Sequence, residues 1–467
     1  MAEAGDRSNR AMRRSTLAAA VLASFLTPFM GSSVNIALPV IGREFSLDAV
    51  SLGWVATTYI LAAAVFLLPF GRLADIKGRR RIFITGLALY AVVSIAIGFS
   101  QSGAQLIALR AAQGISAALL FGTGIAILTS VYPPAERGRV LGINAAAVYI
   151  GLSLGPTAGG LLTSSFGWRS IFFITAIIAL VALYFISTRL KTEWQEASNE
   201  RFDLRGATAY GFSLTALMLG FSELPDITGF IMTAAGILGM VGFIALEANT
   251  PHPILSLNLF RFNTVFALSN AATLINYAAT FATGFLLSLY LQFIKGFSPA
   301  EAGLILVIQP ILMAIISPYA GRLADRIDPR RLATIGMGLS MGGLSMLIVI
   351  SENTSMLYLI AALIVLGTGF GFFSSPNSSA VMGAVLRRQY GIASATLSTM
   401  RLVGQMFSLG IVMLLFALII GRVQVSPEVH VELISSLQVA FALFTGLCLV
   451  GVFASWPRGQ YFPRDHA

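Results

Sequence analysis

The sequence is poor in the residues that bind metal ions. Cysteine occurs once, as Cys448, and there are three histidines in 467 residues. A single cysteine excludes both a disulfide within the chain and a thiolate metal site. His252, His430 and His466 lie far apart in the sequence, so they do not predict a metal site either. We therefore expect neither a metal nor a cofactor.

Charged residues are also scarce. They make up 11% of the sequence, whereas 56% of the residues are hydrophobic. A soluble domain carries roughly a quarter charged residues, so this composition indicates a protein that is solvated mainly by a lipid bilayer. The net charge of +10 could suggest a nucleic-acid partner. However, the basic residues form no stripe with interleaved aromatic residues, and we expect no nucleic acid.

Long apolar runs recur along the chain. A bilayer core is crossed by about 20 apolar residues, and on this basis we predict an all-α polytopic membrane protein with fourteen spans. They are Thr16–Leu38, Gly53–Phe70, Ile82–Phe99, Leu106–Val131, Val140–Leu162, Ile171–Ser187, Leu204–Phe221, Ile227–Leu246, Val265–Phe293, Gly303–Tyr319, Leu332–Ile350, Met356–Leu386, Ile392–Ile420 and Leu437–Trp456. We interpret the first as a retained span and not as a signal peptide.

The polar segments divide these spans into groups. The predicted organisation is a cytoplasmic tail (1–15), a six-helix bundle (16–187), a cytoplasmic linker (188–205), two extra helices (206–247), a second cytoplasmic linker (248–264), a second six-helix bundle (265–456) and a cytoplasmic tail (457–467). The extra pair is the least certain by composition. The alternative to two full spans here is a re-entrant or interfacial segment.

The basic residues predict the orientation. Of the 30 lysines and arginines, all but six lie on the side of the membrane that holds both termini. The six exceptions are Arg43, Arg169, Lys295 and Arg422 on the other side, and Arg110 and Arg401 within spans. Cytoplasmic loops carry an excess of positive charge, so we expect both termini in the cytoplasm.

The pentapeptide Gly-Arg-Leu-Ala-Asp occurs twice, at Gly71–Asp75 and at Gly321–Asp325, each time before a basic cluster. A repeat of this kind predicts two related halves. In the first copy, Asp75 would accept hydrogen bonds from backbone N–H groups and face the arginines that follow Gly78. An ion pair with Arg79 would then latch the cytoplasmic side, although a simple topology anchor is the alternative.

The second copy has Asp328 and Pro329 where the first has Gly78 and Arg79, so we expect a weaker latch there.

A second pattern is a smooth helix face. Gly151, Gly155 and Gly159 are spaced by four residues, which favours close helix packing, and Pro156 removes a backbone hydrogen bond.

Arg110 and Arg401 are a third feature. A charge within a span costs on the order of 2.5–3.5 kcal/mol, so each arginine needs a partner or a water-filled cavity.

Together these segments resemble the major facilitator superfamily, and within it the fourteen-span group of drug:proton antiporters. The resemblance covers nearly the whole chain. It rests on the repeated pentapeptide, Leu109–Gly114, Gly151–Gly160, Tyr290–Gln292 followed by Ser298–Gly303, and Met400–Gln405. It implies two six-helix bundles with two extra central helices, a monomer in the cell membrane, a role for Arg110 in proton coupling, and an outward seal at Gly151–Gly159. Arg401 is the corresponding charge of the second half.

The sequence departs from that group at one position. Met30 stands where these antiporters often carry an aspartate, just before Asn35–Pro39, and every acidic residue falls in a loop, a tail or a span edge. We therefore expect a substrate cavity lined by uncharged polar and aromatic side chains, although each of these could instead join two helices. The candidates are Asn35, Tyr59, Gln113, Asn144, Asn276, Tyr277, Gln309, Asn377 and Gln405.

These features favour a secondary transporter over other classes. No Gly-x-x-x-x-Gly-Lys-Ser/Thr motif for nucleotide binding occurs, so a proton gradient is the expected drive. The leading hypothesis is a proton-coupled exporter of drugs or other small amphiphilic molecules that works by alternating access. The alternative is an exporter of a physiological lipid or metabolite. We expect no enzymatic activity, because no clustered histidines or paired carboxylates fall within the spans.

Overall fold

The computed structural model describes residues 2–195, 202–250, 253–255, 257–386 and 389–455, and it is almost entirely helical. The first half contains α1 (Ala2–Glu44), α2 (Ala49–Lys77), α3 (Arg79–Gly98), α4 (Gly103–Val131), α5 (Pro134–Phe166) and α6 (Arg169–Arg189). Two helices follow, α7 (Leu204–Glu223) and α8 (Ile227–Ala248). The second half contains α9 (Leu257–Phe262), α10 (Thr264–Thr280), α11 (Thr283–Leu289), the π-helix η1 (Tyr290–Ile294), α12 (Pro299–Leu306), α13 (Ile308–Ala324), α14 (Pro329–Leu347), α15 (Met356–Gly383), α16 (Tyr390–Leu415), the π-helix η3 (Phe416–Ile420), the 3-10 helix η4 (Pro427–Val429) and α17 (His430–Ser455).

Short polar residues start many of these helices where the apolar runs begin. Asp48, Ser102 and Ser355 accept hydrogen bonds from backbone N–H groups in the first turns of α2, α4 and α15. Ser298 and Glu301 form a complete capping box at the start of α12. Such caps satisfy donors that have no partner within a helix, so they fix where each span begins.

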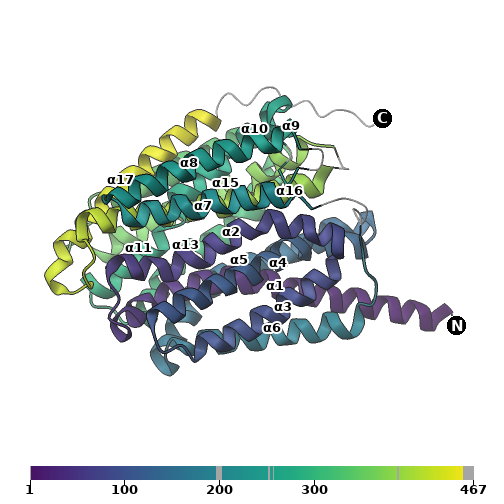
Figure 1. Cartoon of the computed structure of the whole chain (residues 1–467), viewed down its shortest axis with the longest axis horizontal. Helices are drawn as coiled ribbons and strands as arrows, with labels where there is room; N and C mark the ends of the chain where they lie inside the picture. The colour runs from purple at the N-terminus through teal and green to yellow at the C-terminus, as the bar shows by residue number, and fades with distance from the viewer. Residues whose placement is uncertain (1, 196–201, 251–252, 256, 387–388, 456–467) are drawn as a thin grey trace.

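The helices pack as two bundles. In the first bundle, α1 packs against α4, α5 and α6, and α4 packs against α2 and α3. In the second bundle, α14 packs against α15 and α17, and α10 packs against α15, α16 and α17. Figure 1 shows the first bundle in purple and blue and the second in green and yellow.

Twelve helical segments in the described chain are long and apolar enough to cross a membrane. One of them combines α10, α11 and η1 (Thr264–Ile294), and another combines α12 and α13 (Pro299–Ala324). The helices α7 and α14 occupy the positions of two further predicted spans but are not among the twelve. The all-helical fold class is thus confirmed, with twelve candidate membrane spans, whereas fourteen spans and a cytoplasmic location of the termini stay predictions.

The α7–α8 hairpin lies along the line where the two bundles meet. The Tyr210 hydroxyl of α7 donates to the backbone oxygen of Ala64 in α2 at 3.3 Å. Further along α7, the ring of Phe221 lies 6.4 Å from that of Phe407 in α16. The hairpin is also tied to the loop after η3, where an ion pair with Glu223 raises the pKa of the Arg422 guanidinium. One helix therefore contacts both bundles.

Two carboxyl groups, those of the half-buried Asp203 and the buried Glu247, lie close together where α7 begins and α8 ends. Asp203 caps α7 through a hydrogen bond from Gly206 N at 2.9 Å, and Glu247 accepts from Leu255 N at 2.9 Å. The second oxygen of each carboxyl is buried without a hydrogen-bond partner. Both oxygens crowd the same point, because a Cβ on Gly206 would clash with each of them. Two acceptors thus face one another with no donor between them.

We expect Asp203→Asn to stabilise the protein. The asparagine would keep the cap on α7 and place an N–H donor against the unpartnered oxygen of Glu247, which otherwise costs about 1–3 kcal/mol. The melting temperature of the purified protein should rise, and by more at pH 8 than at pH 5, because protonation relieves the same repulsion in the wild type. Asp226→Asn, at the exposed start of α8, is the matched control without this effect. A lower melting temperature for Asp203→Asn would contradict the interpretation.

Candidate functional site

The first copy of the repeated pentapeptide ends α2 and leads into α3. Gly78 adopts φ 111°, a left-handed conformation that favours glycine, and this sharp turn places Arg79 at the start of α3. Arg79 bonds Asp75 through Nη2 at 2.8 Å and through Nε at 2.9 Å. Its Nη1 also donates to Ser130 Oγ of α4 at 3.1 Å. The ion pair predicted for the latch is therefore present in this geometry, and it holds α2, α3 and α4 together.

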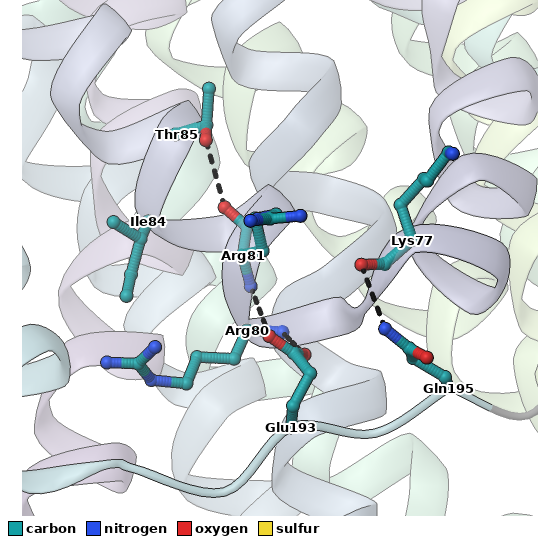
Figure 2. Close-up of a pocket in the computed structure, with 7 residues that line it drawn as sticks. All are labelled: Lys77, Arg80, Arg81, Ile84, Thr85, Glu193 and Gln195. Carbon is teal, nitrogen blue, oxygen red and sulfur yellow. Dashed lines mark hydrogen bonds between the residues drawn. The ribbon is translucent and has the colours of Figure 1, made fainter.

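The backbone N–H groups at the start of α3 have a partner that the sequence did not predict. Asp75 does not accept from them. Instead, the Glu193 carboxylate accepts from Arg80 N at 2.8 Å and from Arg81 N at 3.1 Å (Figure 2). Glu193 comes from the polar linker after α6 and acts as a cap for α3, whose own residue Gly78 has no side chain to do so.

The linker forms one wall of a surface pocket beside this turn. Gln195 donates to the Lys77 backbone oxygen at 3.3 Å, next to Glu193 (Figure 2). The pocket has a volume of about 430 Å³ and is lined by Lys77, Arg80, Arg81, Ile84, Thr85, Glu193 and Gln195. The only signal in the sequence was the polarity of the linker, which does not indicate which acidic residue returns to α3.

Gly71 lies where α2 and α4 approach closely, and this approach depends on a second glycine. A Cβ on Gly122 of α4 would lie 3.2 Å from the Gly71 Cα, so α2 and α4 touch backbone to backbone. A Cβ on Gly71 itself would point into open space. Gly122, which the sequence pattern did not single out, is thus the position that tolerates a side chain less well.

The second copy of the pentapeptide has a different ion pair. Arg330 bonds Asp328 at 2.9 Å, within the turn that starts α14. The Asp325 carboxylate takes part in no hydrogen bond or ion pair with the residues that the structure describes. Gly321 faces Ser375 of α15, whose Oγ would lie 2.7 Å from a Cβ at that position. The two copies therefore differ in which acidic residue binds arginine.

Arg110 lies inside the first bundle and is 1% exposed. Its Nε donates to the Val55 backbone oxygen at 3.1 Å, and its Nη1 donates to Gln113 Oε1 at 2.6 Å. Gln113 in turn donates to Ser94 Oγ at 2.9 Å. The guanidinium carbon lies 4.3 Å from the centroid of the Tyr59 ring. Two predicted cavity residues, Tyr59 and Gln113, thus surround the arginine in the interior of one bundle.

Arg401 lies in the middle of α16, in the second bundle. Its Nη2 donates to Ser378 Oγ at 2.8 Å, and its guanidinium carbon is 5.9 Å from the Tyr277 ring centroid. The ring of Tyr277 meets Phe370 edge-on, with centroids 5.2 Å apart. Arg401 and Tyr277 are both partly exposed, in contrast to Arg110. The structure thus brings one predicted charge and one predicted cavity residue together.

The glycine face of α5 packs against α1 of its own bundle. A Cβ on Gly151 would lie 2.6 Å from the Phe25 backbone oxygen, and one on Gly159 would lie 2.7 Å from Ser33 Cα. Gly155 is equally close to α1, and its backbone oxygen accepts from Ser33 Oγ at 3.0 Å. These three glycines therefore fix the position of α5 within the first bundle.

The contact between the bundles comes from the neighbouring face of α5. A Cβ on Gly303 of α12 would clash with the Pro156 backbone oxygen, and one on Gly160 would clash with the Pro299 backbone oxygen. At the same end of the molecule, Gln292 Nε2 donates to the Ile36 backbone oxygen at 2.9 Å. These backbone contacts close the bundles together at the end that holds the α1–α2 loop. We call this contact the α5–α12 seam.

The other predicted cavity residues are distributed between packing and exposed positions. Asn144 accepts from Ser24 Oγ at 2.9 Å, and Asn377 donates to Thr273 Oγ1 at 2.7 Å, so each joins two helices of its own bundle. Asn276 is fully buried with neither side-chain atom hydrogen-bonded. The side chains of three more are partly exposed: Asn35, Gln309 and Gln405.

The structure also shows the surroundings of Met30, the position at which the related antiporters often carry an aspartate. Met30 is fully buried within α1. In the described chain, the acidic residues lie at helix ends and in the connections between helices. No acidic side chain therefore lies beside Arg110 or Arg401, and the described ion pairs include neither arginine.

Two bundles of long apolar helices that meet along α5, α12 and α13 are the architecture expected of a membrane transporter. The model of the Major Facilitator Superfamily matches residues 20–275 and 270–465, so the chain belongs to that family, as the sequence motifs predicted. It is therefore a multi-pass membrane transporter.

Relatives and a solved structure agree with this assignment. The chain is 34% identical over 395 residues to the multidrug resistance protein Stp of Mycobacterium tuberculosis, covering 83% of this chain and 73% of the relative. It is 30% identical over 383 residues to the riboflavin transporter RibZ of Clostridioides difficile, covering 81% and 82%. Its fold is similar to that of a bacterial homologue of the human lysosomal transporter Spinster, solved in an inward-facing conformation. The TM-score is 0.70 with 14% identity, over 95% of this chain and 97% of the other.

Proposed function

We propose that the protein is a proton-coupled exporter of drugs or other small amphiphilic molecules that works by alternating access. The observation that carries the proposal is the α5–α12 seam. Two bundles in backbone contact at one end, with polar groups between them, can separate there and close at the opposite end as rigid bodies. The names of relatives such as the multidrug resistance protein Stp support drugs as the substrate class.

The proposed drive is a proton gradient. Arg110 is a buried charge with no carboxylate beside it, so a change in its surroundings during transport alters the cost of keeping it charged. Asp75 and Arg79 would hold the cytoplasmic end of the first bundle together as the bundles move. The metabolite-exporter alternative rests on one comparison, the similarity to a protein named riboflavin transporter.

Transport into inside-out vesicles tests the proposal. A fluorescent drug should accumulate when an inward-acid proton gradient is imposed, and accumulation should stop when an exchanger of protons for potassium collapses that gradient. Transport that survives full collapse would exclude proton coupling. Uptake of riboflavin, with no uptake of any drug in a panel of different charges, would favour the metabolite-exporter alternative.

We further propose that the protein is a monomer in the cell membrane, with fourteen spans and both termini in the cytoplasm. In that topology the α7–α8 connection lies outside. A cysteine in place of the exposed Asp226, in a Cys448→Ala background, should react with an impermeant maleimide in intact cells. Labelling in inside-out vesicles only would contradict this topology.

A further inference from the structure

The Arg401 guanidinium is a charge with most of its hydrogen-bonding capacity unused. A guanidinium carries five N–H donors, and the only acceptor it meets in the described chain is Ser378 Oγ, at 2.8 Å from Nη2. The Nε atom is buried and has no hydrogen-bond partner. An unpaired charge within a span is costly, and Arg401 is partly exposed, so its remaining N–H donors are available to a ligand that carries an acceptor.

Arg110, the other arginine within a predicted span, does not share this unused hydrogen-bonding capacity. Arg110 is 1% exposed, makes hydrogen bonds through Nε and Nη1, and has the Tyr59 ring 4.3 Å away. Arg401 is partly exposed, and its nearest aromatic ring, that of Tyr277, is at 5.9 Å. Arg110 is enclosed by its own bundle, whereas Arg401 is open to a ligand.

The surroundings of Arg401 are aromatic and include the first bundle. Tyr277 and Phe370 stand edge to face, with ring centroids 5.2 Å apart. Tyr149 of α5 reaches the second bundle, where its hydroxyl hydrogen-bonds Ser317 Oγ of α13 at 2.7 Å. Ser317 in turn lies against the residue after Phe370, because a Cβ on Gly371 would be 3.4 Å from Ser317 N. A molecule held at Arg401 would therefore contact rings from both bundles, which is the position a transported substrate must occupy.

The chemistry of the site selects one class of ligand. The planar guanidinium fork matches a carboxylate through two parallel hydrogen bonds, and aromatic side chains bind flat apolar bodies. An organic cation would meet an uncompensated positive charge in a medium of low dielectric constant. We propose that Arg401 binds the carboxylate of an aromatic, amphiphilic substrate between the two bundles. This inference rests on the proposed role as an exporter and names its substrate class.

Fluorescence titration of the purified full-length protein tests the inference with two probes. Dansylglycine carries a carboxylate, and dansylamide is its neutral counterpart with the same ring system. The wild type should bind dansylglycine at least about tenfold more tightly than dansylamide, which corresponds to about 1.4 kcal/mol. Arg401→Gln should remove this preference and leave dansylamide binding unchanged. Arg401→Lys should keep part of it, because the charge remains without the fork.

Arg261→Gln is the matched control, because Arg261 is an exposed arginine at the end of α9. It should leave the preference intact. Equal binding of both probes by the wild type, or an unchanged preference in Arg401→Gln and Arg401→Lys, would overturn the inference. Binding of dansylamide by each variant shows that it is folded. The titration is independent of transport, so a carboxylate preference without drug transport would contradict the exporter proposal and leave the site standing.

Discussion

Gly303→Ala should reduce transport by about tenfold or more, although alanine favours helices more than glycine does. A Cβ at this position would clash with the Pro156 backbone oxygen, and a backbone atom cannot move aside without moving α5. Overpacking of this kind costs roughly 1–3 kcal/mol, and the cost falls only on the state in which the α5–α12 seam is closed. The rate of drug efflux from cells measures the effect.

Gly446→Ala provides the control for Gly303→Ala. Gly446 lies within α17, is exposed, and would accept a Cβ in open space. Its variant should transport at the wild-type rate. A cysteine in place of Ser288, beside the closed end of the bundles, should become reactive to external maleimide when Gly303 is alanine, because the seam is forced open. Wild-type efflux by Gly303→Ala would show that closure of this seam is not part of the transport cycle.

Arg110→Gln should abolish the dependence of transport on the proton gradient and lower the driven rate by about a hundredfold. The substitution removes the buried charge, and it leaves the Val55 backbone oxygen and Gln113 Oε1 without their donor, at about 1–3 kcal/mol for each group. Arg110→Lys should retain part of the dependence, since it keeps the charge but loses the fork. The rate of vesicle transport as a function of pH measures both.

A variant with a lower rate but an unchanged pH profile would show that Arg110 only supports the structure of the first bundle. Arg261→Gln serves again as the matched arginine variant, and its pH profile should equal that of the wild type. Drug exchange at equal pH on both sides separates coupling from folding. Arg110→Gln should retain such exchange, because Arg401 and its aromatic surroundings lie in the second bundle and are untouched.

The apolar runs were sufficient to predict where the helices lie. The predicted span Ile392–Ile420, for example, corresponds to α16 and η3 together. The ends were less predictable. The predicted span Thr16–Leu38 lies inside α1, which runs from Ala2 to Glu44, because hydropathy registers only the apolar stretch of a helix and not its polar ends. Composition alone likewise does not decide whether the helices α7 and α14 cross the membrane.

The candidate site was predictable as a set of residues but not as a set of contacts. The spacing of Gly151, Gly155 and Gly159 predicts a smooth face, but it does not say that α1 covers this face while Gly160 and Gly303 form the seam. Glu193 shows the same limit over a longer distance. Its carboxylate accepts from Arg80 N, 113 residues earlier in the chain, and no local pattern links the two. Residues that only tertiary packing brings together produce no periodic pattern in the sequence.

Because of the α7–α8 hairpin, the two sides of the protein differ in how far lipid can reach the contact between the bundles. It contacts both α2 and α16 where these two helices meet, whereas the principal helix contacts include none between this hairpin and α5, α12 or α13, where the bundles meet on the other side. In the proposed cycle, a cargo dissolved in the lipid would therefore have a single lateral entrance, beside α5. The flank behind the hairpin would admit none, because one helix there stays in contact with both moving bundles. Entry from the membrane would thus be one-sided, even though the two bundles themselves are built alike.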